Sequence, residues 1–164
     1  MPAKPRVYIE TSIISYLTAR PSRDVIAMAR LEITQRWWEL RRARFELFVS
    51  QLVIEESLAG DEQAALRRMR EITRLRLIDI NDDAIELAEA LMSSSSIPPV
   101  AGADMLHIAI ATVNRMDFLL TWNHKHLANA TLRRAVSSIT QDNCYVPIVI
   151  CTPDELMGDL ADER

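Results

Sequence analysis

The sequence predicts an α/β protein whose sheet is mainly parallel and covered by helices on both faces. Short runs rich in β-forming residues recur along the chain, and stretches with apolar residues at helical spacing separate them. Parallel strands need long crossover connections, so this alternation favours a parallel sheet over a series of hairpins. No internal repeat is visible, which excludes a solenoid.

Five runs are predicted to be strands, each short and apolar enough to be buried. In order they are "RVYI" at 6–9, "FELFVS" at 45–50, "LRLIDI" at 75–80, "FLLT" at 118–121 and "VPIVIC" at 146–151. The sheet should therefore contain about five strands.

Helices are predicted between these runs. The stretch from about Asp24 to Arg44 lacks Gly and Pro and has apolar residues at helical spacing, including Ile33 and Trp37. Because Trp37 and Trp38 are adjacent, one should pack in the core and the other at a rim or an interface. Asp82 is predicted to cap a helix that ends at Met92. The run 105–113 is apolar almost all round, which indicates a helix buried in the middle of the fold. Further helices are expected at 52–58, 62–72 and about 127–139.

Length and composition predict one domain over residues 1–164, with a core at about 6–151 and an acidic C-terminal tail. The 164 residues, 49% of them hydrophobic and 26% charged, are typical of a folded globular protein. No apolar run approaches the ~20 residues of a membrane span, and no signal-peptide core is present, so we expect a cytoplasmic protein. Cys144 and Cys151 match no metal or redox motif and are expected to be reduced. The tail contains Asp154, Glu155, Asp159, Asp162 and Glu163.

The net charge of −4 does not indicate nucleic-acid binding, but the basic residues are unevenly distributed. Arginines outnumber acids between Arg20 and Arg44, and a second group lies between Arg67 and Arg76. Such arginines can simply be solvated helix faces, or they can contact phosphates or an acidic partner.

The stretch "VYIETSII" places an acid, Glu10, directly after the first strand. One interpretation is that Thr11 or Ser12 caps the next helix while Glu10 lies in solvent. The other is that Glu10 belongs to a cluster of carboxylates, because sites in parallel α/β sheets lie at the carboxyl ends of the strands.

Three other polar residues could lie near Glu10. Glu56 lies about two turns into the helical stretch that follows the second strand, and Asn123 follows the fourth. Asp104 stands at the start of the most apolar helix, where a helix N-terminus stabilises negative charge. Alone, Asp104 could be a simple N-terminal cap.

Four segments together resemble a PIN domain, and more narrowly the VapC-like toxins of type II toxin–antitoxin pairs. They are "VYIETSIISYL", "VSQLVIEESLAG", "ADMLHIAIAT" and "FLLTWNHKHLAN", in an order and spacing that cover roughly Val7 to Cys151. The resemblance implies a three-layer α/β/α sandwich, a metal-dependent endoribonuclease, an antitoxin partner and a homodimer.

The resemblance also assigns site residues. Its acidic positions fall on Glu10, Glu56 and Asp104, with Asn123 at a fourth position that is often Asp; these four would bind Mg²⁺ or Mn²⁺ and form the catalytic site. The hydroxyl that supports the first acid matches Thr11 or Ser12. His107 follows Asp104 by three residues and could hydrogen-bond a ligand carboxylate, or it could be a histidine at the edge of the core.

The chemistry of RNA hydrolysis fits this residue set. Mg²⁺ prefers oxygen ligands and keeps several waters, so three carboxylates can hold it and leave room for a phosphate oxygen. Such close carboxylates should repel one another in the metal-free protein, so that neutralising Glu10 would stabilise it.

Two departures from the family pattern keep an alternative open. Glu at the first position and Asn at the fourth leave one negative charge fewer than the commoner pattern, which is also compatible with a PIN-like binding or scaffold protein with a weakened site. A receiver-type phosphoacceptor is disfavoured, because no Asp ends a central strand. The helix from Asp24 to Arg44, with Arg41 and Arg42, is expected to border a groove for an antitoxin peptide.

Overall fold

A computed structural model describes residues 3–158 and contains a five-stranded sheet with the order β3-β2-β1-β4-β5. The strands are β1 (Arg6–Ile9), β2 (Glu46–Ser50), β3 (Arg76–Ile78), β4 (Phe118–Leu120) and β5 (Val149–Cys151). Every neighbouring pair is parallel, as the alternation of strands and helices predicts. Both edge strands are shorter than their apolar runs: three residues of β3 pair with β2, and three residues of β5 pair with β4.

The order of the strands places a topological switch point between β1 and β4. The chain builds outward from β1 through β2 to β3, then crosses over to add β4 and β5 on the other side of β1. Tyr8 of β1 therefore lies in register with Phe48 of β2 and with Leu119 of β4. In such sheets a crevice opens beyond the carboxyl ends of the two strands at the switch point.

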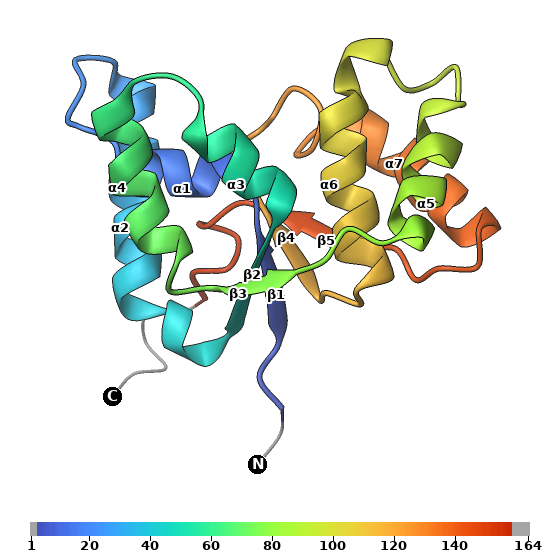
Figure 1. The fold of residues 1–164 in the computed structure, drawn as a ribbon, viewed down its shortest axis with the longest axis horizontal. Coiled ribbons are helices and arrows are strands. Elements are labelled where there is room, and N and C mark those ends of the chain that lie inside the picture. The colour runs from blue at the N-terminus through green and yellow to red at the C-terminus, as the bar shows by residue number, and fades with distance from the viewer. Residues whose placement is uncertain (1–2, 159–164) are drawn as a thin grey trace.

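In the described part of the chain, seven α-helices form the two outer layers of a three-layer α/β/α sandwich (Figure 1). The first layer contains α1 (Thr11–Leu17), α2 (Val25–Leu40), α3 (Gln51–Leu58) and α4 (Glu62–Ile72), and α1 contacts the other three. The second contains α5 (Asp82–Met92), α6 (Gly102–Val113) and α7 (Ala130–Asp142), with α5 packed on both others. Short 3-10 turns occupy Arg42–Arg44 and Pro99–Ala101.

Helix ends differ from their predicted positions where side chains outside the apolar pattern act as caps. Asn81, not Asp82, is the N-cap of α5, and its side chain accepts a hydrogen bond from the Ala84 amide. Asn129 likewise starts α7, so the helix begins at Ala130 and Leu127 is a buried loop residue. Both asparagines satisfy amides that the first helical turn leaves unpaired.

The core confirms the buried central helix and corrects the prediction for the tryptophans. Ile108 and Ile110 of α6 are fully buried, as the apolar run predicts. Trp37 and Trp38 are both buried, so the prediction that one lies at a rim is wrong. Trp37 stacks on Phe45 at 5.7 Å between ring centroids, while the Arg42 guanidinium lies over Trp38 and shields it from solvent.

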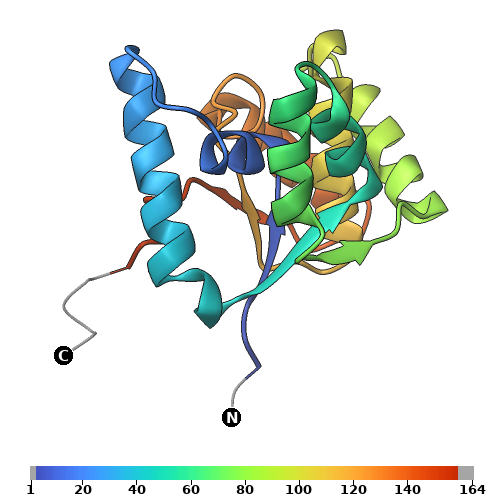
Figure 2. The same cartoon turned by 60° about the vertical axis from the view of Figure 1, so that its left-hand side comes forward.

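The end of the described chain returns to the long helix α2 (Figure 2). A side chain at Gly158 would touch the guanidinium of Arg41, which is itself buried. Arg41 is therefore not available to a peptide groove on α2, and that part of the expectation is wrong. Of the predicted acidic tail, Asp159, Asp162 and Glu163 lie outside the described residues.

Cys144 and Cys151 are both free thiols, as expected. Within residues 3–158, no helix is long and apolar enough to cross a membrane.

Candidate metal centre

Glu10 lies at the switch point and is buried, not solvated. Its amide donates to the carbonyl of Leu120 at 3.1 Å, which carries the β1–β4 pairing one residue beyond Ile9. Glu10 itself is the N-cap of α1: its backbone is extended and its side chain accepts from the Ser12 amide at 3.1 Å. The interpretation in which Thr11 or Ser12 caps the helix beside a solvated Glu10 is therefore wrong.

One carboxylate oxygen of Glu10, Oε2, accepts three hydrogen bonds. Besides the Ser12 amide, the donors are the hydroxyls of Ser12 and Thr121, the latter at 2.7 Å. Ser12 in turn accepts from the Trp122 amide at 2.8 Å, which ties the end of β4 to the start of α1. Within residues 3–158 the other oxygen, Oε1, accepts no hydrogen bond, so it is free to bind a cation.

Glu56 lies in the last turn of α3, where the helix dipole disfavours a negative charge. Two donors offset this: the Thr11 hydroxyl bonds its Oε2, and Nε2 of His107 lies 3.0 Å from the same atom. Burial by itself would raise the pKa of Glu56, but the hydrogen bond and electrostatic attraction of His107, together with the Thr11 hydrogen bond, lower that pKa below its ordinary value. Glu56 is therefore a carboxylate at neutral pH.

His107 is held by a buried chain of hydrogen bonds. Its Nδ1 lies 2.7 Å from the hydroxyl of Tyr8, which is also 2.7 Å from the hydroxyl of Ser50. Burial raises the pKa of Tyr8, so the phenol keeps its proton. Nε2–H donates to Glu56, and Nδ1 accepts from the Tyr8 hydroxyl when the imidazole is neutral or donates to it when the imidazole is charged. Ser50 can donate to or accept from Tyr8, so every member of the chain is satisfied in both cases.

Asp104 stands in the first turn of α6, as predicted, where the helix dipole favours its charge. Its two oxygens have different partners: Oδ1 accepts from the Asn123 side-chain amide at 2.8 Å, and Oδ2 lies 2.7 Å from Nδ1 of His126. The side-chain oxygen of Asn123, Oδ1, accepts from the His126 backbone amide at 3.1 Å. Asn123 and His126 therefore orient Asp104.

The structure brings the sequence-predicted residues together in two adjoining groups. In the first, single ligand atoms of Glu10, Glu56 and His107 all lie within 4.8 Å of one another. The second group consists of Asp104, Asn123 and His126. Thr121 joins the two groups, because its hydroxyl donates to Glu10 and accepts from the backbone amide of Asn123 at 2.9 Å.

Several members of this network have no signal in the sequence motifs. Tyr8 and Ser50 read simply as strand residues, and Thr121 as the last residue of an apolar run. The motifs assign no role to His126 in the segment that follows the fourth strand. Their positions at or beside the carboxyl ends of β1, β2 and β4 are the feature that could have pointed to them.

The donor set fits a hard divalent cation. Oε1 of Glu10 is free, Glu56 is ionised and half-buried, and each Asp104 oxygen keeps a second lone pair beside its hydrogen bond. Both nitrogens of His107 are already hydrogen-bonded, so His107 suits an orienting role better than that of a ligand.

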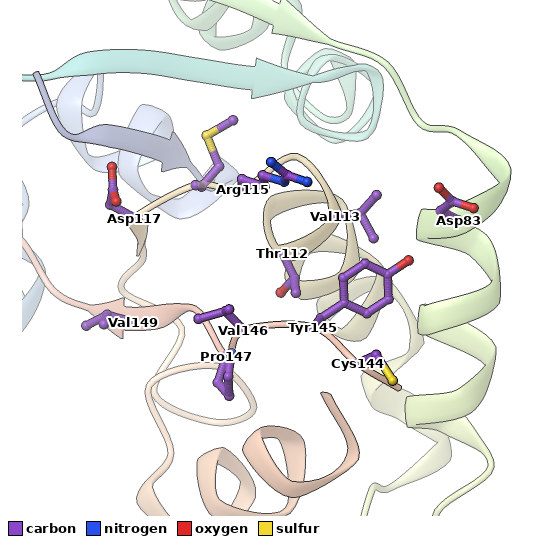
Figure 3. A pocket seen from close by; sticks show the side chains of 11 residues that line it. Asp83, Thr112, Val113, Arg115, Asp117, Cys144, Tyr145, Val146, Pro147 and Val149 are labelled. Atoms are coloured by element: carbon purple, nitrogen blue, oxygen red, sulfur yellow. The ribbon is translucent and has the colours of Figure 1, made fainter. Parts of the chain in front are cut away.

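A separate cavity of about 750 Å³ lies at the amino ends of β4 and β5 (Figure 3). It contains Asp83, Arg115 and Asp117, with Tyr145 and Val149 among its other lining residues. None of the sequence-predicted site residues lines it. The carboxylates at the opposite ends of the strands are the stronger candidate, because ligand atoms of Glu10 and Glu56 lie within 4.8 Å of each other there and Asp104 belongs to the adjoining group.

A doubly wound parallel sheet with carboxylates at its switch point defines a class of α/β proteins with an acidic site. Within that class the fold is that of the PIN-domain VapC proteins. VapBC2 from Rickettsia felis, solved bound to a DNA fragment from its promoter, matches 90% of this chain and 98% of its own with a TM-score of 0.58 and 13% identity.

Two further solved structures share this fold. VapC20 of Mycobacterium tuberculosis, a toxin that cleaves the sarcin–ricin loop, has a TM-score of 0.57 and 16% identity over 73% of this chain and 91% of its own. VapBC-1 of nontypeable Haemophilus influenzae has a TM-score of 0.55 and 13% identity over 91% and 98%. The sequence matches no family model and has no significant match among curated proteins. The likeness therefore rests on the fold.

Proposed function

We propose that this protein is a divalent-metal-dependent endoribonuclease. The observation that carries the proposal is the convergence of Glu10 and Glu56 at the switch point, with Asp104 linked to them through Asn123 and Thr121. A phosphodiester nuclease needs a group of oxygen ligands at a place that a nucleic-acid strand can reach.

The Mg²⁺ or Mn²⁺ ion would be bound by Glu10, Glu56 and Asp104. The side-chain oxygen of Asn123 accepts one hydrogen bond and has a second lone pair for the ion. When bound, the ion would stabilise charge on the attacked phosphate and make a water more acidic. The protein's own part is to hold the ligands. Ser12 and Thr121 fix Glu10, Thr11 and His107 fix Glu56, and His126 fixes Asp104.

We further propose that the nuclease is the cytoplasmic toxin of a type II toxin–antitoxin pair and acts as a homodimer. The solved proteins that share its fold include a toxin–antitoxin complex from Klebsiella pneumoniae as well as the two VapBC structures. That likeness supports the proposal of an antitoxin partner. The exposed face of α2, together with exposed Arg42 of the 3-10 turn that follows it but not buried Arg41, stays a candidate for its contact.

One observation favours the alternative of a PIN-like binding or scaffold protein. The side-chain amide of Asn123 donates to Asp104, so this carboxylate is satisfied without a cation, whereas an Asp at the same position would repel it. A site of this kind binds a metal less strongly than one with four acids.

Cleavage assays distinguish the two proposals. The protein should cut single-stranded regions of RNA in Mg²⁺ or Mn²⁺, and Glu56→Gln or Asp104→Asn should each remove most of the activity. Glu55→Gln is the matched control, because Glu55 is the exposed neighbour of Glu56 on the same helix. Full activity in EDTA, or equal activity of Glu55→Gln and Glu56→Gln, would contradict the nuclease proposal.

A further inference from the structure

Arg30 is a half-buried arginine of α2 whose guanidinium lies over two aromatic rings. Its Cζ atom is 5.8 Å from the ring centre of Tyr16 and 5.6 Å from that of Trp122, and one NH1 proton is donated to the Tyr16 hydroxyl at 3.3 Å. Among residues 3–158, no carboxylate forms a salt bridge with Arg30. The side chain is therefore oriented but its charge is not neutralised.

Trp122 is itself held rigidly. Its indole Nε1–H donates to the Thr34 hydroxyl at 2.7 Å, and that hydroxyl donates to the carbonyl of Arg30 at 2.6 Å. The Trp122 backbone amide donates to Ser12, the residue whose hydroxyl bonds Glu10. Trp122 thus connects Arg30 to the carboxylate network through two short hydrogen-bonded links.

A second basic side chain lies beside the same indole. The His124 ring centre is 6.1 Å from that of Trp122, and the His124 amide donates to the Trp122 carbonyl at 2.9 Å. His124 and the next residue, Lys125, are exposed. We call Tyr16, Arg30, Trp122 and His124 the Trp122 platform.

The negative charge of the neighbouring carboxylate site explains why a basic side chain is needed at the Trp122 platform. Glu10, Glu56 and Asp104 are acidic, so an RNA strand that approaches them is repelled unless cations lie near its phosphates. A guanidinium over aromatic rings is weakly hydrated and pre-organised, and its remaining N–H groups match the geometry of a phosphate. Trp122 is only 7% exposed, so base stacking on the indole is not available.

We propose that Arg30, assisted by His124, binds a backbone phosphate of the RNA strand beside the phosphate placed at the carboxylate site. This inference deepens the proposed nuclease function and rests on it for the identity of the ligand. Arg30 is a binding residue here and takes no part in the reaction itself.

Binding and cleavage should be measured separately. Fluorescence anisotropy with a labelled RNA strand of randomised sequence, in EDTA where the proposed cleavage does not run, reports the affinity alone. Arg30→Gln should weaken binding about tenfold at low salt, as expected for the loss of a charge-assisted hydrogen bond. The slope of log affinity against log salt should fall by ~0.7, the value for one phosphate contact with a single strand.

Matched variants separate this role from a structural one. Arg36→Gln removes the same charge from an exposed position of α2 and should leave affinity and slope near their original values. Arg30→Lys keeps the charge and should retain the salt slope while losing part of the affinity. Melting temperatures of all variants show whether each is folded.

The outcomes are distinct. If Arg30→Gln binds RNA like Arg36→Gln, with the same slope, the inference is overturned while the nuclease proposal stands. If Arg30→Gln loses affinity but the original protein cleaves no RNA in Mn²⁺, the nuclease proposal fails and the phosphate contact stands. If the original protein binds no RNA in EDTA but cleaves it in Mn²⁺, only the inference is overturned; if it neither binds RNA in EDTA nor cleaves it in Mn²⁺, both are overturned.

Discussion

Nε2 of His107 lies 3.0 Å from Oε2 of Glu56 and joins α6 to the last turn of α3. These helices belong to opposite layers of the sandwich, so the contact spans the switch point of the sheet. His107 is buried, whereas the Glu56 side chain is about a third exposed. The imidazole therefore holds the carboxylate from the protein side and leaves its other side open to solvent.

The first prediction concerns this contact. His107→Gln should raise the pKa of Glu56, because burial, which opposes the charge, is then no longer outweighed by the attraction of an imidazole. A ¹³C NMR titration of the side-chain carboxylates, with Glu56→Gln for assignment, measures the shift. His124→Gln, which removes an exposed histidine, is the control. An unchanged pKa of Glu56 in His107→Gln would show that Thr11 alone stabilises the charge.

The second prediction concerns stability at acidic pH. The folded-state pKa of Glu56 lies below its ordinary value of 4.5, so the carboxylate stabilises the fold fully above pH ~4.5 and loses this contribution as pH falls through the folded pKa. Urea unfolding across this pH range should show that the free energy of unfolding of Glu56→Gln falls less on acidification than that of the original protein. Glu55→Gln, which changes an exposed residue of α3, should follow the original protein. If the free energy of unfolding depends on pH in the same way in all three proteins, the lowered pKa of Glu56 is contradicted.

The third prediction concerns metal binding. Mn²⁺ at a hundredfold excess over its dissociation constant should stabilise the fold by ~2.7 kcal/mol, which raises the melting temperature by about 5–10 °C for a chain of this size. Glu10→Gln should reduce this rise. Equal shifts in the original and variant proteins would exclude Glu10 as a ligand.

The same melts in EDTA test the metal-free state. The sequence alone led us to expect that neutralising Glu10 would stabilise it by removing repulsion. The hydrogen bonds of Glu10 support the opposite prediction, because its Oε2 accepts from Ser12 twice and from Thr121, and charged acceptors form the stronger hydrogen bonds. Glu10→Gln should therefore cost about 1 kcal/mol without metal. A higher melting temperature of metal-free Glu10→Gln would show that repulsion between the carboxylates outweighs these hydrogen bonds.

The fourth prediction concerns the thiols. Burial raises the pKa of Cys151 to about 12, with the Glu155 carboxylate adding to the effect, so this thiol stays protonated at neutral pH. Because thiolates are the reactive form, a disulfide reagent should label exposed Cys144 quickly and Cys151 only on unfolding. Cys144→Ser should abolish the rapid phase. A rapid phase that persists in Cys144→Ser would show that Cys151 is accessible.

The sequence by itself determined the elements and the order in which they alternate, because these depend on local patterns. Val7–Ile9 are apolar and flanked by polar residues, and 105–113 is apolar all round; both read correctly as a buried strand and a buried helix. The positions of Glu10 and Asp104 at element ends were also readable, since each acid adjoins an apolar run. Caps such as Asn81 were missed by one residue because Asp82 is an equally good capping residue.

Only the tertiary structure decided which side chains meet. Asp104 and His107 are three residues apart on α6, yet Asp104 bonds Asn123 and His126 while His107 bonds Glu56. These partners come from the loop after β4 and from α3. They are brought together because the chain crosses over after β3 and adds β4 on the other side of β1. A local pattern carries no information about contacts across that crossover, because they depend on how the two helical layers pack against one sheet. For this reason the carboxylates could be anticipated from the sequence, whereas Tyr8, Thr121 and Arg30 became visible as their neighbours only in the folded chain.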